Sequence, residues 1–362
     1  MPKIRFFRES FSPTSAIETR NLELVLESNG WTIPRFSFRL FTPYNLNWTL
    51  HNAIFNNYLS RPPIQDGKDY TNTALPINQE AFMNSKDIRI QKDPELIASG
   101  FIFTEGPVWH PDGYLLFSDI PANTIYSWSP DKGTGTYISN SNNSNGLTFD
   151  SNGTLIICEH SGRRVSRMSF DGTLETIASH YLGKRLNSPN DVVVHSNGEI
   201  YFTDPAFGIN PSQEELGFKG VFRIKNDTTL ELLISDFSAP NGLAFSPDES
   251  TLYVDDSIGR ATWAFALSPN GRLSNDRILV NQDLPDPGSP DGMKVDMAGN
   301  VYVTGAGGLW IVDPAGNHID TLKFPEQPSN LAFGDSDMMS IYITARTSIY
   351  KIRTNVPGVR VY

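Results

Sequence analysis

Thr104-Glu105-Gly106-Pro107 is the first of six similar segments, each placed where a strand is predicted to begin. The other five are Ser144-Asn145-Gly146-Leu147, Pro189-Asn190-Asp191-Val192, Pro240-Asn241-Gly242-Leu243, Pro290-Asp291-Gly292-Met293 and Ser329-Asn330-Leu331. They recur at intervals of about 40 to 50 residues, a period typical of propellers and solenoids. One such unit cannot bury its apolar face without neighbours, so the repeat predicts a ring or stack of like units.

Each repeat reads as short strands separated by turns. In the second repeat, Leu147-Thr148-Phe149 is followed by the turn Asp150-Ser151-Asn152-Gly153 and then by three further strand-like runs. Those runs are Thr154 to Cys158, Arg164 to Met168 and Leu174 to Ala178, with Asp171-Gly172 as a hairpin signal. Because a period of two dominates after about residue 93, we predict an all-β fold of four-stranded units.

The two ends of the repeat region complement each other. The last repeat offers three strands, beginning at Leu331, Ser340 and Ser348, and a lone strand, Glu95 to Ser99, precedes the first repeat. If that strand becomes the outer strand of the last unit, the ring closes without an unpaired contact. We therefore predict a six-bladed β-propeller over residues 93–356, its sixth blade closed by an N-terminal strand.

Residues 1–92 do not join the repeat, and we interpret them as a partly irregular N-terminal extension of unknown role. One short helix is predicted around Asn52 to Leu59. The first thirty residues contain no apolar core of secretory length, so we expect a cytoplasmic protein.

Composition narrows the classes of partner. The chain has 362 residues, 39% hydrophobic and 19% charged, and no apolar run long enough to cross a membrane. A formal charge of −11 argues against nucleic acid as a partner, because phosphate binding needs a basic surface. Cys158 is the only cysteine, which excludes an intramolecular disulfide and a thiolate zinc cluster. The sequence gives no prediction of oligomeric state.

Propeller geometry gives the six segments a common place. The first strands of all blades line the central channel in the same sense, so residues at their starts converge on one mouth. That ring is Glu105, Asn145, Asn190, Asn241, Asp291 and Asn330. Two carboxylates held together there need a cation or protons. Oxygen ligands favour a hard cation, Ca2+ first and Mg2+ or Mn2+ second. The alternative is that Asn, Asp and Gly merely mark turns, but Glu105 is a poor turn residue.

Second strands should end at the same mouth, farther from the axis. They end near Asp119, Glu159-His160, Asp204, Asp255-Asp256 and Arg346. For Asp119, Asp204 and Asp255 we expect a structural role in holding loop amides, whereas Glu159, His160 and Arg346 are candidate substrate contacts. The segment Pro205 to Lys219 is the longest insertion on this face and a candidate lid.

These residues resemble the senescence-marker-protein, gluconolactonase and luciferin-regenerating-enzyme family, and within it the bacterial gluconolactonase type. The resemblance rests on Phe103 to Trp109, Leu116 to Ile120, Ser144 to Phe149, Cys158 to His160, Leu186 to Asp191, Tyr201 to Pro205, Pro240 to Asp248 and Pro290 to Met293. It covers residue 93 to the C-terminus and leaves out the first ninety residues.

The resemblance implies a propeller with one divalent ion per chain, usually Ca2+ with Mg2+, Mn2+ and Zn2+ as alternatives, that hydrolyses lactones. It places the metal ligands at Glu105, Asn190, Asn241 and Asp291, with Asp291 as candidate general base. Asn145 and Asn330 are then neighbours of the ion or face the substrate. Ser188 stands where animal sugar lactonases carry arginine, two positions before the blade-3 asparagine.

The expected reaction is hydrolysis of a sugar lactone such as glucono-1,5-lactone to the aldonic acid. Two alternatives use the same mouth: a hydrolase of organophosphates or aryl esters, and a propeller that binds calcium without catalysis. The chain has no Gly-x-Ser-x-Gly nucleophile elbow, no His-Glu-x-x-His motif and no phosphate loop, which argues against other hydrolase chemistries.

Overall fold

The computed structural model describes residues 3–7, 20–28, 31–32, 36–40, 93–169 and 171–361. The chain divides into two compact units, Met1–Leu75 and Pro76–Tyr362. In the first unit a four-stranded antiparallel sheet is formed by β1 (Lys3–Phe7), β2 (Arg20–Ser28), β3 (Trp31–Thr32) and β4 (Phe36–Leu40). The helix predicted around Asn52 lies outside the described residues.

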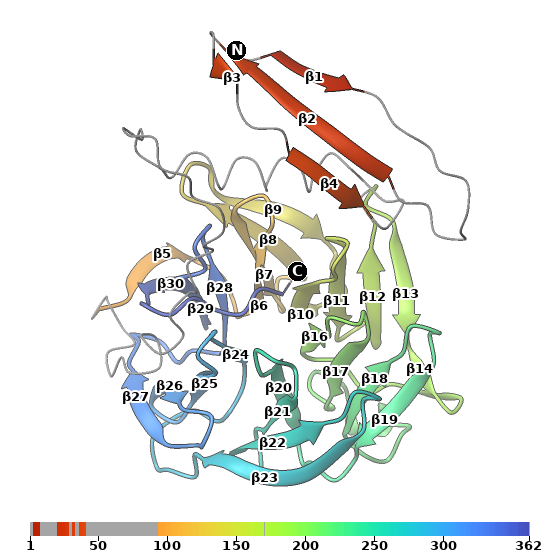
Figure 1. The fold of residues 1–362 in the computed structure, drawn as a ribbon. Coiled ribbons are helices and arrows are strands. Elements are labelled where there is room, and N and C mark those ends of the chain that lie inside the picture. Colours follow the sequence, from red (N-terminus) through yellow and green to blue (C-terminus); the bar gives the residue numbers. More distant parts are fainter. Residues whose placement is uncertain are drawn as a thin grey trace. The chain divides into compact units, whose positions relative to one another are not determined.

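The second unit contains six four-stranded antiparallel sheets arranged around a centre, as Figure 1 shows. Blade 1 consists of β6 (Thr104–His110), β7 (Tyr114–Asp119), β8 (Thr124–Ser129) and β9 (Gly133–Ser139). Blade 2 consists of β10 (Ser144–Phe149), β11 (Leu155–Glu159), β12 (Arg164–Met168) and β13 (Leu174–Ala178). Blade 3 consists of β16 (Val192–Val194), β17 (Ile200–Asp204), β18 (Gly220–Ile224) and β19 (Leu230–Ile234).

The remaining blades repeat the plan. Blade 4 consists of β20 (Pro240–Phe245), β21 (Thr251–Asp256), β22 (Ala261–Leu267) and β23 (Leu273–Asn281). Blade 5 consists of β24 (Met293–Val295), β25 (Val301–Gly305), β26 (Gly308–Val312) and β27 (His318–Leu322). Blade 6 consists of β28 (Asn330–Gly334), β29 (Ser340–Ala345), β30 (Ser348–Arg353) and β5 (Glu95–Ser99). A small hairpin, β14 (His180–Tyr181) and β15 (Lys184–Arg185), precedes blade 3, and the 3-10 turn η1 (Pro211–Gln213) lies between β17 and β18.

Blade 6 confirms the predicted closure. Its strand order is β28-β29-β30-β5, with Ile349 opposite Ala98 and Ser348 opposite Ser99. Each first strand contacts the first strands of both neighbouring blades, so β6, β10, β16, β20, β24 and β28 form a closed inner ring. The predicted all-β, six-bladed propeller is therefore confirmed.

The turns between first and second strands share one geometry that explains their sequence. Gly113, Gly153, Gly198 and Gly299 each donate a backbone N–H to the carbonyl three residues earlier, at 2.8–2.9 Å. All four have positive φ, from 76° to 91°, which favours glycine over other residues. In blade 4 the equivalent position is Glu249, with φ 56°. These turns keep the first strands short and in register.

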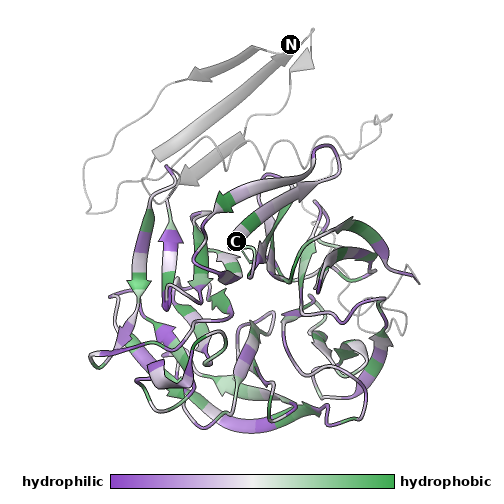
Figure 2. Cartoon of the chain, turned by 180° about the vertical axis from the view of Figure 1, so that it is seen from behind, coloured by the Kyte–Doolittle hydropathy of each residue, from purple (hydrophilic) through white to green (hydrophobic). Residues whose placement is uncertain are grey.

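Apolar side chains fill the spaces between neighbouring blades. One cluster joins blades 4 and 5 through Tyr253, Met293, Val303 and Trp310. Another joins blades 1 and 6, where the rings of Trp109 and Tyr342 stack with centroids 4.9 Å apart. Figure 2 shows hydrophobic segments concentrated in the strands of the propeller. Burial between blades thus holds each first strand in place. Across the described residues, no helix has the length and apolar character needed to span a membrane.

Two truncations test the closing strand. A chain beginning at residue 93 keeps β5, whereas a chain beginning at residue 100 lacks it and leaves the β30 edge unpaired. We expect the shorter chain to lose about 3 kcal/mol or more of unfolding free energy relative to the longer one, because it loses the strand ladder and the packing of Ile97. Denaturant unfolding of both chains measures this difference, and equal stabilities would contradict the closure.

Candidate active site

The six ring residues lie together at one end of the inner strands. Glu105, Asn145, Asn241 and Asn330 lie within the first two positions of their first strands, and Asn190 and Asp291 precede theirs by two residues. All are buried except Asp291, which is partly exposed. The structure therefore brings together the predicted metal ligands and both neighbouring asparagines.

Glycine after the ring residue is explained by close packing between blades. A Cβ on Gly106 would collide with the carbonyl oxygen of Asn145 in the next blade, and a Cβ on Gly242 would collide with that of Asp291. The same approach allows a hydrogen bond from Gly242 N to Asp291 O at 2.7 Å. The glycines of the Glu105-Gly106 and Asn241-Gly242 pairs are thus required for contact between blades.

The amide side chains form a directed chain of hydrogen bonds around the mouth. Asn145 Nδ2 donates to Asn190 Oδ1 at 2.7 Å, and Asn190 Nδ2 donates to Asn241 Oδ1 at 2.5 Å. Asn241 Nδ2 then donates to Ser257 Oγ at 2.9 Å, and Ser257 Oγ donates to Pro290 O at 2.6 Å. The side-chain oxygens of Asn190 and Asn241 are thereby held on the side of the preceding blade. The sequence analysis missed Ser257, which follows the end of β21.

Glu105 and Asp291 provide the charge at this mouth. Glu105 Oε2 accepts from Gly106 N at 2.8 Å and from Asn330 Nδ2 at 3.2 Å. Burial, with a smaller contribution from the Asp191 charge, raises the pKa of Glu105 to about 7. Burial and then the charge of Glu105 raise the pKa of Asp291 well above its ordinary value. The two carboxyl groups are therefore close enough to oppose each other's ionisation.

A third acid, Asp191, belongs to the same group and was missed in the sequence. It is 3% exposed, and its Oδ2 has no hydrogen-bond partner, while Oδ1 accepts from Val192 N at 2.9 Å. Its charge acts on both Glu105 and Asp291. The signal was present, because Asp191 occupies the place where four of the six segments have glycine.

The ends of the second strands hold loops, as expected for Asp119 and Asp204. Asp119 accepts from the amides of Ile102 and Phe103 at 2.9 and 3.1 Å, and Asp204 accepts from Asn187 N at 2.8 Å. In blade 4 the expectation for Asp255 was wrong. Asp256 accepts from the Ser238 and Ala239 amides, because the two side chains of adjacent strand residues point to opposite faces.

The three candidate substrate contacts fall in different places. Glu159 is fully engaged by Arg164, Ser166 and Asn142 at 2.5–2.9 Å and does not contact the ring. His160 Nε2 lies 3.3 Å from Asn145 Nδ2 and 3.2 Å from Asn190 Oδ1, so it joins the ring. Burial lowers the pKa of His160 to about 4, which makes it a neutral hydrogen-bonding group. Arg346 is exposed on the β29–β30 turn beside the start of β6.

The Pro205 to Lys219 insertion lies against the mouth. Gly208 faces the ring of His160, and Ser188 Oγ donates to Phe207 O. The far half is anchored by buried Leu216 and by Glu215, which accepts from Arg185 N at 2.8 Å. The Ser188 hydroxyl therefore anchors this loop, which lies beside the His160 ring.

The ring fits a hard cation by its donor chemistry. It presents two carboxylates and several amide oxygens, and repulsion between the carboxylates is relieved by a bound positive charge. Within the described part of the chain, no three His, Cys, Asp or Glu side chains gather as a metal site. Amide oxygens would therefore have to supply part of any coordination shell.

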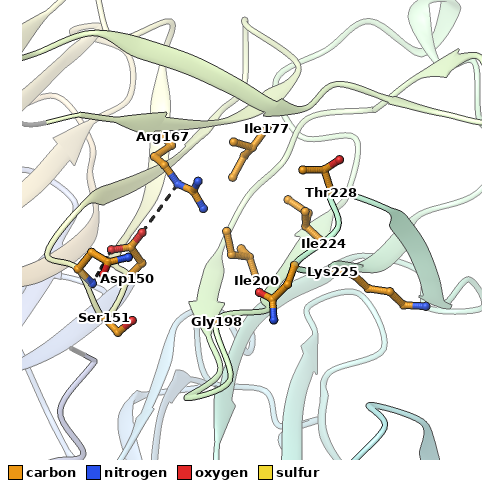
Figure 3. Close-up of a pocket in the computed structure, with 11 residues that line it drawn as sticks. Asp150, Ser151, Arg167, Ile177, Gly198, Ile200, Ile224, Lys225 and Thr228 are labelled. Atoms are coloured by element: carbon orange, nitrogen blue, oxygen red, sulfur yellow. Dashed lines mark hydrogen bonds and ion pairs between the residues drawn. The ribbon is translucent and has the colours of Figure 1, made fainter. Parts of the chain in front are cut away.

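A separate pocket of about 260 Å³ lies at the other end of the strands, between blades 2 and 3 (Figure 3). It is lined by the turns that follow the first strands, including Asp150 and Gly198, and by Ile200 and Lys225. Arg167 Nε lies 3.8 Å from Asp150 Oδ2 in its wall. Because ring residues start the first strands and these turns end them, the pocket is remote from the mouth.

The raised pKa of Glu105 predicts how metal-free stability depends on pH. Between the ordinary value of 4.5 and about 7, the folded protein keeps a proton that the unfolded chain releases. In chelator, the unfolding free energy should therefore fall as pH rises through this window, by on the order of 3 kcal/mol. Glu105→Gln should make the fall shallower. Denaturant unfolding at pH 4.5 to 8 measures both, and identical profiles for the two proteins would contradict this assignment.

Comparison with known proteins agrees with this geometry. The family model described as "SMP-30/Gluconolactonase/LRE-like region" matches residues 103–347. A gluconolactonase of Zymomonas mobilis is 34% identical over 293 residues, covering 73% of this chain and 82% of that protein. The pentonolactonase XacC of Haloferax volcanii is 28% identical over 247 residues, covering 66% of this chain and 80% of that protein.

A solved structure of a gluconolactonase from Xanthomonas campestris superposes with a TM-score of 0.67 at 30% identity, covering 74% of this chain and 97% of that one. The matched region contains all six ring residues and all six first strands, whereas β5 and β30 of the closing blade lie outside it. The chain therefore belongs to the SMP-30/gluconolactonase/LRE-like family.

Proposed function

We propose that this protein is a divalent-metal-dependent lactonase that hydrolyses a sugar lactone such as glucono-1,5-lactone to the aldonic acid. The chain is a lactonase by its family and by its gluconolactonase and pentonolactonase relatives. The observation that carries the proposal is the pair Glu105 and Asp291, which share one mouth with hydrogen-bonded amides. Metal dependence and the sugar substrate are the proposed parts.

The residues proposed to hold the ion are Glu105, Asn190, Asn241 and Asp291, and Ca2+ suits this mixed, neutral-rich oxygen set better than Mg2+. When bound, a divalent cation would polarise the lactone carbonyl and stabilise negative charge on its oxygen. Asn190 and Asn241 would present oxygens fixed by their neighbours' amides. One ion per chain matches one ring.

Asp291 is proposed as the general base. Water would add to the carbonyl carbon while its proton passes to the Asp291 carboxylate, and the ring C–O bond would then break as Asp291 returns that proton to the leaving oxygen. Neutral His160 and Asn145 lie on the blade-2 side of the mouth, where they can bind substrate hydroxyl groups without adding charge. Arg346 is exposed at the rim of the mouth, and we propose that it contacts an extended or anionic substrate.

Specificity is proposed to depend on the blade-3 wall. Ser188 is short and uncharged where the animal sugar lactonases carry arginine, and its hydroxyl donates to Phe207 O. Phe207 and Ile209 are partly exposed near His160 and offer apolar contact beside the polar mouth. A compact sugar lactone fits that combination of one apolar wall and several amide groups.

A hydrolysis panel tests the function. Glucono-1,5-lactone, dihydrocoumarin and an organophosphate should be offered to the full chain with calcium and after chelation. We expect calcium-dependent hydrolysis of the sugar lactone above the other two substrates. Faster turnover of the organophosphate would move the assignment to that alternative, and tight calcium binding without any hydrolysis would favour a binding propeller.

Asp291→Asn tests the base. The substitution keeps size and one oxygen but removes the proton acceptor, so kcat should fall by about a thousandfold, within the range of general base catalysis. Circular dichroism should show a folded propeller. Asp131→Asn, on the exposed turn between β8 and β9, is the matched control and should retain activity. Substantial turnover by Asp291→Asn would point to another base.

A further inference from the structure

The pocket between blades 2 and 3 contains an arginine that lacks the partners of its counterpart in the next blade. Arg167 is the next-to-last residue of β12, and Arg223 is the next-to-last residue of β18. Their neighbours on the outer strands are also equivalent, because Arg167 lies opposite Glu175 and Arg223 lies opposite Glu231. The two arginines therefore occupy the same place in consecutive blades and can be compared directly.

Protein groups bind the guanidinium of Arg223 on several sides. Arg223 is buried and bonds to Glu231, to Glu199 at 3.3 Å and to Asn270 O at 2.8 Å. Its Nη1 lies so close to the blade-4 turn that a Cβ on Gly271 would be 1.2 Å from it. Glycine in that turn therefore lets the arginine of blade 3 reach the next blade.

Arg167 faces a turn of the same geometry that has no glycine at this point. The N–H of Thr228, like that of Gly271, donates to the carbonyl three residues earlier, and the two residues have φ 67° and 77°. Thr228 thus carries the Cβ that would collide with an arginine placed like Arg223. Arg167 cannot make the equivalent contact, and a cavity of about 260 Å³ lies between it and the turn.

Arg167 also lacks carboxylate partners at hydrogen-bonding distance. Its Nε is shielded from solvent and has no hydrogen-bond partner within the described residues. Asp150 Oδ2 lies 3.8 Å from this Nε, and Asp150 Oδ1 accepts from the amides of Asn152 and Thr154 at 2.9 and 3.0 Å. Thr154 occupies the blade-2 position equivalent to Glu199, so that acid is missing too. A buried donor without an acceptor costs free energy, which a ligand with acceptor oxygens would offset.

Lys225 is the second cation in the lining of the pocket. Its Nζ lies 3.2 Å from Glu231 Oε2, but that carboxylate is already bonded to Arg223. Two cations, Arg167 and Lys225, and one acid, Asp150, therefore line the pocket. A ligand with a single negative charge balances the charges of these lining residues.

The remaining walls limit the size and polarity of a ligand. Figure 3 shows Arg167 and Thr228 on opposite sides of the pocket, with Ile177 and Ile200 between them. The cavity therefore combines a charged end with an apolar wall. Since its volume is below the roughly 300–1,000 Å³ of most ligand pockets, the occupant is a small molecule with a short carbon chain.

We propose that this pocket binds a small hydroxycarboxylate anion, with the carboxylate on the Arg167 guanidinium. A guanidinium is planar and presents paired N–H donors that match the two oxygens of a carboxylate. The isoleucine side chains would contact the carbon atoms of the ligand, and the hydroxyl groups of Ser151 and Thr228 line the same space. The site is separate from the mouth and does not depend on the proposed reaction, although an aldonic acid belongs to this class of anion.

Gluconate calorimetry tests the site. The full chain is used in chelator, so that no divalent ion can hold gluconate at the mouth. We expect one gluconate per wild-type chain and no binding of sorbitol, which has the hydroxyl groups without the charge. Arg167→Gln should weaken gluconate binding by about tenfold or more, because charge-assisted hydrogen bonds are lost. Arg277→Gln, which removes the same charge from an exposed arginine bonded to Pro314 O, is the matched control and should keep the wild-type affinity.

The inference is overturned if the wild type binds no gluconate, if sorbitol binds as tightly, or if folded Arg167→Gln keeps the wild-type affinity. None of these results bears on lactone hydrolysis. Conversely, gluconate binding that depends on Arg167 in a protein that hydrolyses no lactone would remove the proposed function and keep the pocket. If Arg167→Gln does not fold, Lys225→Gln decides. Weaker gluconate binding in that variant supports the inference, and unchanged affinity overturns it.

Discussion

The structure depends on the cost of holding carboxyl groups in a buried channel. Six first strands start at the same mouth, and any charged residue at those starts is drawn toward the others by the closure of the ring. Glu105 and Asp291 meet there, and burial raises the pKa of both. In a lone strand each acid would be solvated. Closure of the propeller brings them together as the proposed cation-binding and proton-accepting pair.

The fold protects this arrangement at several levels. β5 pairs with β30 and closes blade 6, so β28 and β6 remain neighbours and Asn330 reaches Glu105. Glycines after the ring residues let adjacent blades approach to hydrogen-bonding distance. Directed amide contacts from Asn145 to Ser257 then fix which way the Asn190 and Asn241 side-chain amides are turned. Strand pairing, close packing at glycine and amide hydrogen bonds therefore all position the ring residues at this mouth.

The repeat period and the polar residues at the strand starts were sufficient to predict the propeller. In a closed ring of blades, all first strands start at the same mouth, whatever their individual side-chain contacts. The same argument located all six ring residues, and the family resemblance selected Glu105, Asn190, Asn241 and Asp291 among them as candidate metal ligands. It could not locate Ser257, whose role depends on side-chain contacts between blades that no periodicity encodes. Asp191 was visible as a missing glycine but was read as part of the repeat. The loop-holding role was assigned to Asp255 instead of Asp256, because the sequence does not show which face of β21 each side chain points to.

The central claim is that a divalent ion replaces protons on the Glu105 and Asp291 carboxyl groups. The most direct measurement is calcium calorimetry near pH 7 in two buffers of different ionisation enthalpy, which gives the protons released per ion bound. Because burial raises the pKa of Glu105 to about 7 and raises the pKa of Asp291 well above its ordinary value, we predict release of about one proton or more per calcium ion. Calcium binding with no proton release would contradict the account.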